Sequence, residues 1–179
     1  ALQALAFEFL TPQDGSTDVA VQASQVALLA RASGYQGMAG GQAIDLASVG
    51  VALNEAQLRQ MHRLKTGALI MASVTLGARA ALASASRRRA LAQYGAAIGL
   101  AFQIADDVLD ITATTDQLGK TAGRDIALHK STYPALLGVD GAIERAVALV
   151  EEGCRALADE GLLTPTLDQL ARYIVERRS

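Results

Sequence analysis

Residues 102–110 of this chain read FQIADDVLD, a stretch that brings three carboxylates into an otherwise apolar run. On a helix at about 100° per residue, Asp106 and Asp110 share one face, Asp107 lies beside them, and Gln103 stands one turn earlier. Charged side chains near a core are costly unless their charge is compensated, and like charges one turn apart repel each other. Mg²⁺ removes both objections, because it binds one or two carboxylates and completes its shell with water and phosphate oxygens. The stretch therefore predicts a metal site, although the same spacing also occurs on solvated helix faces.

The residues around these aspartates favour the metal site over the solvated face. They are too apolar for a helix surrounded by water. The apolar neighbours are Ile98, Leu100, Phe102, Ile104, Val108, Leu109 and Ile111. We therefore expect the three carboxylates to lie at the edge of a core.

Lysine usage points to an anion beside the metal. The chain has 13 Arg residues but only three Lys residues, Lys65, Lys120 and Lys130, and each stands next to a Gly, Ser or Thr. Lysine meets phosphate as a compact point charge. Carboxylates for a metal, followed at intervals of ten residues by Lys120 and Lys130, predict a diphosphate site. For Lys65 the alternative is a side chain that extends to solvent from an apolar helix face.

Composition predicts an all-helical protein. Of 179 residues, 51% are hydrophobic and only 4% aromatic, and Trp is absent. A β-sandwich would need more β-branched and aromatic side chains. The length fits a single domain over residues 1–179 that can bury a sizeable core. We expect an all-α fold in the form of a helical bundle.

Charge and cysteine content exclude several classes of protein. A net charge of −2, with no basic stripe beyond residues 87–89, gives no case for nucleic acid. No uninterrupted apolar run reaches about 18 residues, so no membrane span is expected. The lone Cys154 allows no disulfide within the chain, and without a signal peptide the expected compartment is the cytoplasm.

The apolar periodicity predicts six helices. Their expected ranges are 1–10, 18–33, 54–80, 86–113, 132–159 and 166–177. The pairs Asn54–Gln57 and Thr166–Gln169 resemble capping boxes at two helix starts. Helical spacing begins at Leu2 with no cap and no Met before it, so we expect the chain to start inside a helix of a longer protein.

Three segments carry more specific expectations. The predicted inner face of the second helix consists of Val19, Ala23, Val26, Leu29 and Ala30. Glycines at 34, 37 and 41 can allow close approach of helices, and the helix over 132–159 is expected to kink near Pro134 and Gly138. Gln42 and Asp45 share a face only if the Gly-rich segment is helical, and an interhelical hydrogen bond explains them equally well.

Six segments, in order, carry a resemblance to a known family. They are GGQAIDL at 40–46, HRLKTGAL at 62–69, GLAFQIADDVLD at 99–110, LGKT at 118–121, GRD at 123–125 and KSTYP at 130–134. Together they resemble the C-terminal part of a trans-isoprenyl diphosphate synthase of the bacterial farnesyl diphosphate synthase type. The agreement covers nearly all of the chain and is far more specific than any single motif.

The resemblance implies a fold, a reaction and a metal. The fold would be an isoprenoid-synthase-type helical bundle, usually a homodimer, truncated here at its N-terminal side. The reaction would be head-to-tail condensation of an allylic diphosphate with isopentenyl diphosphate. Asp106, Asp107 and Asp110 match the second aspartate-rich motif of the family, which binds Mg²⁺ against the allylic diphosphate.

The resemblance also implies roles for other residues. Lys65 and Lys120 match lysines that contact the diphosphate, with Lys130 as a third. Thr66 and Gln103 match positions that face the nascent allylic cation, so Lys65, Thr66 and Gln103 are the expected catalytic residues. In the same way, Gln42 and Asp45 match a pair that lines the cavity.

The chain departs from the family pattern in one respect. The first aspartate-rich motif, the basic residues for isopentenyl diphosphate and the bulky residues that stop chain growth would all precede Ala1, and no second Asp-Asp pair replaces them. We therefore expect residues 1–179 alone to be inactive. The alternatives are a geranylgeranyl or longer-chain diphosphate synthase and a non-catalytic helical interaction subunit. A terpene cyclase would not need this set of lysines.

Overall fold

A computed structural model describes residues 1–112 and 130–177 of the chain, and every regular element within these ranges is a helix, as composition predicts. None of the described helices is both long enough and apolar enough to cross a membrane. The helices are α1 (Leu2–Phe9), α2 (Val19–Ser33), α3 (Met38–Ala47), α4 (Glu55–His62), η1 (Arg63–Gly67), α5 (Ala68–Ala80), α6 (Ala85–Thr112), α9 (Tyr133–Asp159) and α10 (Pro165–Glu176).

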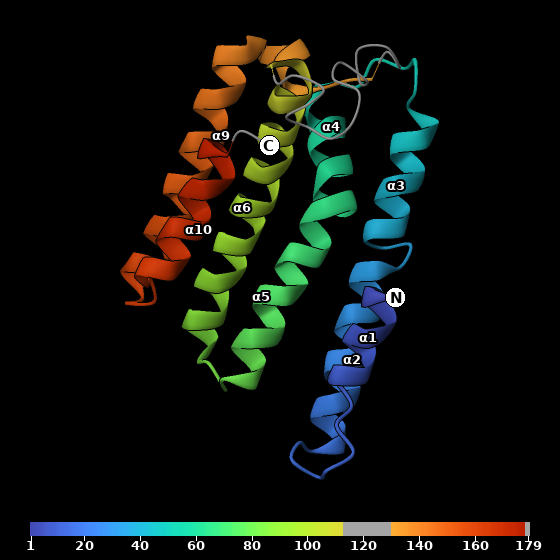
Figure 1. Ribbon diagram of the computed structural model, residues 1–179, viewed down its shortest axis with the longest axis vertical. Coiled ribbons are helices and arrows are strands. Elements are labelled where there is room, and N and C mark those ends of the chain that lie inside the picture. Colours follow the sequence, from blue (N-terminus) through green and yellow to red (C-terminus); the bar gives the residue numbers. More distant parts are fainter. Residues whose placement is uncertain (113–129, 178–179) are drawn as a thin grey trace.

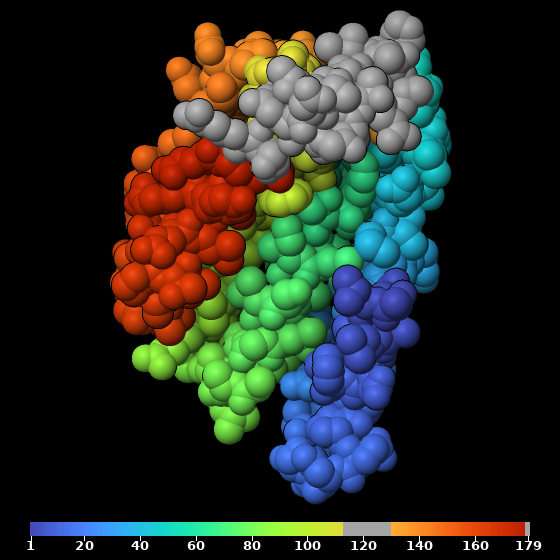
Figure 2. All heavy atoms as spheres, viewed as in Figure 1, coloured from blue at the N-terminus to red at the C-terminus, as the bar shows by residue number. Residues whose placement is uncertain are grey.

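The helices stand side by side along one long direction (Figure 1). α9 packs against α6, α6 against α5 and η1, and η1 against α3, while α10 covers α6 and α9. α1 and α2 form one edge of the molecule, where Figure 2 shows their atoms in blue. The arrangement places the C-terminal end of α6 close to α4, η1 and the start of α9.

α6 forms the middle of the core. Ala101 and Ile104 on α6 have no exposed surface, and Tyr94 and Ile98 are also buried. The missing side chain of Gly153 lets α9 come close to α6, because a Cβ at this position would stand 3.3 Å from the Ala97 Cβ. A helix of 28 residues that packs on neighbours from several sides is held by burial rather than by helix propensity.

Two predicted helix signals are confirmed. The Asn54 side chain accepts from the Gln57 backbone N–H and the Gln57 side chain accepts from the Asn54 backbone N–H, which is the predicted capping box. In α9, Gly138 has φ 75° and ψ 165°, so the helix is kinked there as predicted. A left-handed φ favours glycine, which has no Cβ to clash with the backbone.

The predicted cap of the last helix is wrong by two residues. The N-cap is Thr164, whose side chain accepts from the Leu167 backbone N–H. Pro165 then occupies the first helical position, where a missing N–H has no consequence. The Thr166–Gln169 spacing therefore falls inside α10 instead of at its start.

The predicted inner face of α2 is largely wrong. Leu29 is buried and Val26 partly buried, but Ala23 and Ala30 are exposed and Val19 is 77% exposed. α2 packs on α5 and, at its end, on α3. Because the position of these neighbours selects the buried stripe, apolar spacing alone does not identify it.

The predicted helix over 54–80 is confirmed over residues 55–80, with one local irregularity. Residues Arg63–Gly67 form a π-helical turn between α4 and α5, and this turn contains Lys65 and Thr66. A π-turn accommodates one extra residue in a helix and is frequent at functional sites. Apolar side chains pack inward on both sides of the turn, since Leu58 and Met61 are buried and Leu69 is partly buried.

Glycines let η1 lie against its neighbours with backbone on backbone. A Cβ on Gly41 in α3 would stand 2.1 Å from the backbone nitrogen of Lys65, so no side chain fits there. A Cβ on Gly99 in α6 would stand 3.0 Å from the Gly67 Cα. The prediction of close helix approach is confirmed at Gly41.

We predict opposite effects for two Gly→Ala substitutions. Gly41→Ala is expected to lower the free energy of unfolding by about 3 kcal/mol, because overpacking forces α3 away from η1. Gly77→Ala in α5 is the matched control, since a Cβ there meets nothing within 4 Å. It is expected to raise that free energy by about 0.5–1 kcal/mol, because alanine is the better helix former. Denaturant unfolding measures both, and equal stabilities would contradict the proposed packing.

Candidate functional site

A cavity of about 420 Å³ lies between α3, α4, η1, α6 and the residues that precede α9. It gathers predicted site residues from separate helices. The predicted residues that line it are Gln42, Asp45, Lys65, Gln103, Asp106, Asp107, Asp110 and Lys130. The structure therefore brings together, along one cavity, side chains that stand up to 88 positions apart, from 42 to 130.

Asp45 joins two of the predicted lysines. Its Oδ2 accepts from Lys65 Nζ at 2.8 Å and from Lys130 Nζ at 3.2 Å. Asp45 itself is only 5% exposed. The Gly-rich segment is helical, so Gln42 and Asp45 share a face of α3, and Asp45 provides the interhelical contact considered above.

The two ammonium groups keep Asp45 ionised. Burial alone would raise the pKa of the Asp45 carboxyl, but the hydrogen bonds and positive charges of Lys65 and Lys130 outweigh it. The pKa of Asp45 is therefore below its ordinary value of 3.8. The result is a fixed negative charge that orients two cations at one wall of the cavity.

Thr66 and Gln103 form a second contact across η1 and α6. The Thr66 hydroxyl donates a hydrogen bond to the Gln103 side-chain oxygen. Gln103 lines the cavity and is buried, while Thr66 is partly buried behind it. Gln103 therefore brings its amide dipole to the cavity wall, whereas Thr66, predicted to face the same cavity, contacts Gln103 and is not among the residues that line it.

Asp106 and Asp110 suit a hard divalent cation. Both carboxylates line the cavity that Lys65 and Lys130 also line. Within residues 1–112 and 130–177, no group of three or more His, Cys, Asp or Glu side chains could hold a metal by itself. This arrangement fits Mg²⁺, which takes one or two carboxylates and completes its shell with water and substrate phosphate.

Asp107 contacts protein groups at two helix ends. It is 4% exposed, as Asp110 is 2% exposed, and its Oδ2 accepts the Tyr133 backbone N–H at 3.0 Å. The same oxygen lies 3.3 Å from His62 Nε2. Asp107 thus binds protein groups at the start of α9 and the end of α4.

Sequence reasoning missed His62 and Arg177. His62 had no expected role, yet it is buried against Asp107. The Arg177 guanidinium carbon lies 4.4 Å from the centroid of the Phe102 ring, and its Nη2 is 3.6 Å from Asp106 Oδ1. Neither contact has a signal in the sequence, because each joins residues more than 40 positions apart.

Lys120, the remaining predicted diphosphate ligand, lies outside the described residues.

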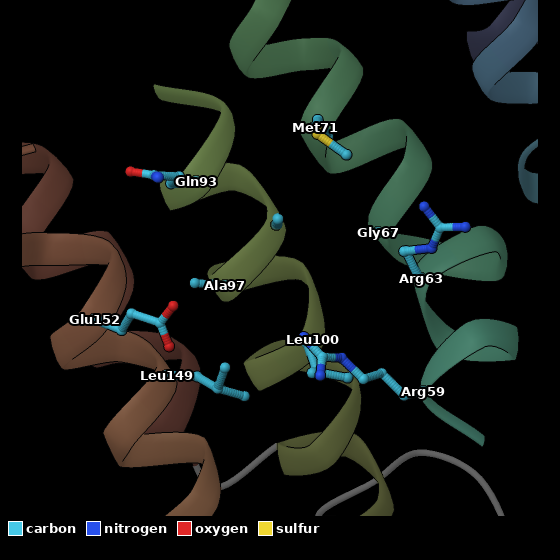
Figure 3. Close-up of a pocket in the computed structure, with 10 residues that line it drawn as sticks. Arg59, Arg63, Gly67, Met71, Gln93, Ala97, Leu100, Leu149 and Glu152 are labelled. Carbon is cyan, nitrogen blue, oxygen red and sulfur yellow. The ribbon is translucent and has the colours of Figure 1, made fainter. Parts of the chain in front are cut away.

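A second pocket, of about 180 Å³, opens where α4, η1 and α5 meet α6 and α9 (Figure 3). Its floor contains Gly67, Met71 and Ala97, and Arg59 and Glu152 come from opposite walls. It lacks the lysines and the aspartate cluster, so the larger cavity is the candidate site.

Comparisons with known proteins agree on one family. The family model described as polyprenyl synthetase matches residues 1–156. The chain is 45% identical to the farnesyl diphosphate synthase of Escherichia coli (strain K12) over 187 residues, covering 99% of the chain but 61% of that protein. The chain therefore spans about three fifths of the length of this curated relative.

Solved structures share the fold. An FPP/GFPP synthase from Zymomonas mobilis in its apo form has a TM-score of 0.79 and 38% identity, covering 97% of this chain and 57% of that chain. A geranyltransferase from Helicobacter pylori, complexed with magnesium and isoprenyl diphosphate, has a TM-score of 0.78 and 29% identity. That comparison covers 97% of this chain and 56% of the other.

We predict that Asp45→Asn destabilises the protein in a pH-dependent way. At pH 7 the free energy of unfolding is expected to fall by about 2 kcal/mol, because two charge-assisted hydrogen bonds are lost. Since the folded-state pKa of Asp45 lies below 3.8, the ionised carboxylate stabilises the wild type above that pH, and this contribution is lost as the pH falls through the folded-state pKa.

The measurement is denaturant unfolding of both proteins from pH 7 down to about pH 3, where the difference should shrink. The control is Asp159→Asn, which removes an exposed carboxylate from α9. A difference between Asp45→Asn and wild type that stays constant over this pH range would contradict the assigned ion pairs.

Proposed function

The chain belongs to the polyprenyl synthetase family, and from that membership we propose that it is the C-terminal portion of a head-to-tail prenyltransferase. The proposed reaction joins an allylic diphosphate to isopentenyl diphosphate, as in enzymes of the farnesyl diphosphate synthase type. One observation carries the proposal: Lys65 and Lys130 line the same cavity as Asp106 and Asp110. Cations and carboxylates at one cavity suit a substrate that binds as a metal diphosphate.

The proposed metal is Mg²⁺, held by Asp106 and Asp110 through oxygens of the kind it prefers. When bound, Mg²⁺ would neutralise negative charge on the diphosphate, which is the leaving group. The Helicobacter pylori geranyltransferase structure is described as complexed with magnesium and isoprenyl diphosphate. That description supports both the metal and the substrate class proposed here.

Lys65 and Lys130, joined by Lys120, would hold the allylic diphosphate. Their ammonium groups stabilise negative charge on the departing diphosphate, so that the allylic C–O bond ionises. Thr66 and Gln103 offer oxygen dipoles to the resulting cation. The double bond of isopentenyl diphosphate then attacks the cation, and loss of a proton gives a chain five carbons longer. Gln42 would line the cavity, and Asp45 would orient the two lysines.

Product length has a second candidate. The Zymomonas mobilis structure is described as an FPP/GFPP synthase, so a protein of this fold can make products of different chain length. The farnesyl type is our main reading, because the Escherichia coli relative carries that name at 45% identity. A geranylgeranyl or longer-chain synthase is the alternative, and product analysis by mass spectrometry of the complete protein distinguishes them.

We also propose a homodimer in the cytoplasm. Leu2 and Phe9 on α1 and Val19 on α2 are 82%, 74% and 77% exposed, which suits an edge that a second copy covers. Cys154 is a free, buried thiol, as is usual in a reducing compartment. The expected inactivity of residues 1–179 alone stays a prediction, which an assay with both diphosphates checks.

We predict that Asp106→Ala and Asp110→Ala weaken Mg²⁺-dependent binding of inorganic pyrophosphate. Each substitution removes a metal carboxylate, so the dissociation constant is expected to rise by about 100-fold, within the range for losing a charged hydrogen-bonded group. Isothermal titration calorimetry with the complete protein measures it. The control, Glu151→Gln, removes an exposed carboxylate from α9. Unchanged affinity in both alanine variants would support a non-catalytic interaction subunit instead.

We predict different kinetic effects for neighbouring residues of η1. Thr66→Val removes a dipole that acts on the cation, so kcat should fall about tenfold with little change in KM. Lys65→Met removes a cation that binds the diphosphate before and during ionisation, so KM for the allylic substrate should rise as well. Steady-state kinetics of the complete protein separate the two patterns. If Thr66→Val changed KM alone, its assignment to the cation would be wrong.

A further inference from the structure

A buried cluster of His62, Asp107 and Tyr133, here named the His62 clamp, lies at the wall of the candidate cavity, which His62 and Asp107 line. His62 is the last residue of α4, Asp107 lies in α6 and Tyr133 is the first residue of α9. Their exposed fractions are 3%, 4% and 0%. Three elements that are separate in the sequence therefore meet at one point, and the proposed reaction chemistry uses neither His62 nor Tyr133.

The contacts within the clamp are specific. Asp107 Oδ2 accepts the Tyr133 backbone N–H at 3.0 Å and lies 3.3 Å from His62 Nε2. The His62 and Tyr133 rings stack, with centroids 5.9 Å apart and an interplanar angle of 22°. A carboxylate at the first N–H groups of α9 also interacts favourably with the helix dipole. The clamp thus fixes where α9 begins relative to α4 and α6.

The burial of His62 leaves one of its ring nitrogens without a hydrogen bond, so another contact must favour histidine at this position. His62 Nδ1 has no hydrogen-bond partner within the described part of the chain. Burying an unsatisfied polar atom is unfavourable, and a leucine of similar volume would avoid that cost. The contact between Nε2 and Asp107 is what histidine adds over leucine.

The clamp is linked to both cavity lysines. Lys65 follows His62 by three residues, and Lys130 precedes Tyr133 by three residues. Both lysines return to one atom, Asp45 Oδ2. Because three residues span at most about 11 Å, the backbone of each lysine lies close to the clamp. The clamp and Asp45 therefore close a ring that determines the separation of the two cations.

We infer that His62 is a positioning residue for the diphosphate site, which acts through Asp107 and the start of α9 to place Lys130 opposite Lys65. This inference rests on the proposed function and refines it. It assigns Asp107 to the clamp and leaves Asp106 and Asp110 as the carboxylates for the metal. The role assigned to His62 is indirect, because its Nε2 contacts Asp107.

A double-mutant cycle in the complete protein tests the inference. His62→Leu is expected to weaken binding of inorganic pyrophosphate, with Mg²⁺ present, about tenfold, because Lys130 loses its placement. In a Lys130→Met background the same substitution should change affinity less than about twofold, since the group it positions is gone. His62→Gln, whose amide can donate to Asp107, should restore most of the affinity. An equal loss in both backgrounds would overturn the inference.

A second measurement needs no diphosphate. Acylation of Lys65 and Lys130 in the ligand-free protein, followed by mass spectrometry, reports how accessible each ammonium group is. His62→Leu should raise the labelling rate of Lys130 severalfold, whereas Leu157→Ala should not. Leu157 has no exposed surface and lies at the other end of α9, so its loss destabilises the core without touching the clamp.

The two measurements separate the inference from the proposed function. If Lys130→Met itself left pyrophosphate binding unchanged, the proposed role of that lysine would be wrong. The labelling rate of Lys130 in His62→Leu would then be the only test of the clamp. If pyrophosphate binding required Lys130 but His62→Leu changed neither the affinity nor the labelling rate, the clamp would be overturned and the proposed function would stand. If labelling of Lys130 also increased in Leu157→Ala, the effect of His62→Leu would reflect general loss of core packing, and the positioning role of His62 would be overturned.

Discussion

The close contact between the backbones of η1 and its neighbours is the constraint on which the rest of the site depends. Gly41 and Gly99 let α3 and α6 reach the π-turn without a Cβ between them. Only at this separation can Asp45 reach Lys65 and Gln103 reach Thr66. Packing at two glycines therefore determines the electrostatics of the cavity, because charge-assisted hydrogen bonds need distances of about 2.7–2.9 Å.

Within that frame the acidic residues have different tasks. Asp45 is a structural anion whose pKa two lysines hold below its usual value. Asp107 is engaged with Tyr133 and His62 at the junction of three helices. Asp106 and Asp110 line the cavity, where carboxylates suit the proposed metal. Neighbouring residues of one aspartate-rich motif thus have different surroundings, since Asp107 contacts α4 and α9 while Asp106 lies near Arg177.

Much of the fold follows from local rules. Periodicity and the Asn54–Gln57 box identify helices, because the spacing of apolar residues and the pairing of cap groups involve only near neighbours in sequence. The inner face of α2 and the π-turn η1 do not follow from such rules, because both depend on which helix packs alongside. Val19 is exposed because no described element packs on it. The π-turn lies where the backbone of α3 is in close contact with it.

The sequence alone determined the residue types of the site, since carboxylates at helical spacing and three scarce lysines already predict a metal and a diphosphate. It also determined that the protein is built of helices. Tertiary structure decided how these groups combine, including the joint ion pairs of Asp45 and the burial of His62 against Asp107. The physical reason is range: helix formation and capping act over a few residues, whereas ion pairs and burial join residues up to 85 positions apart.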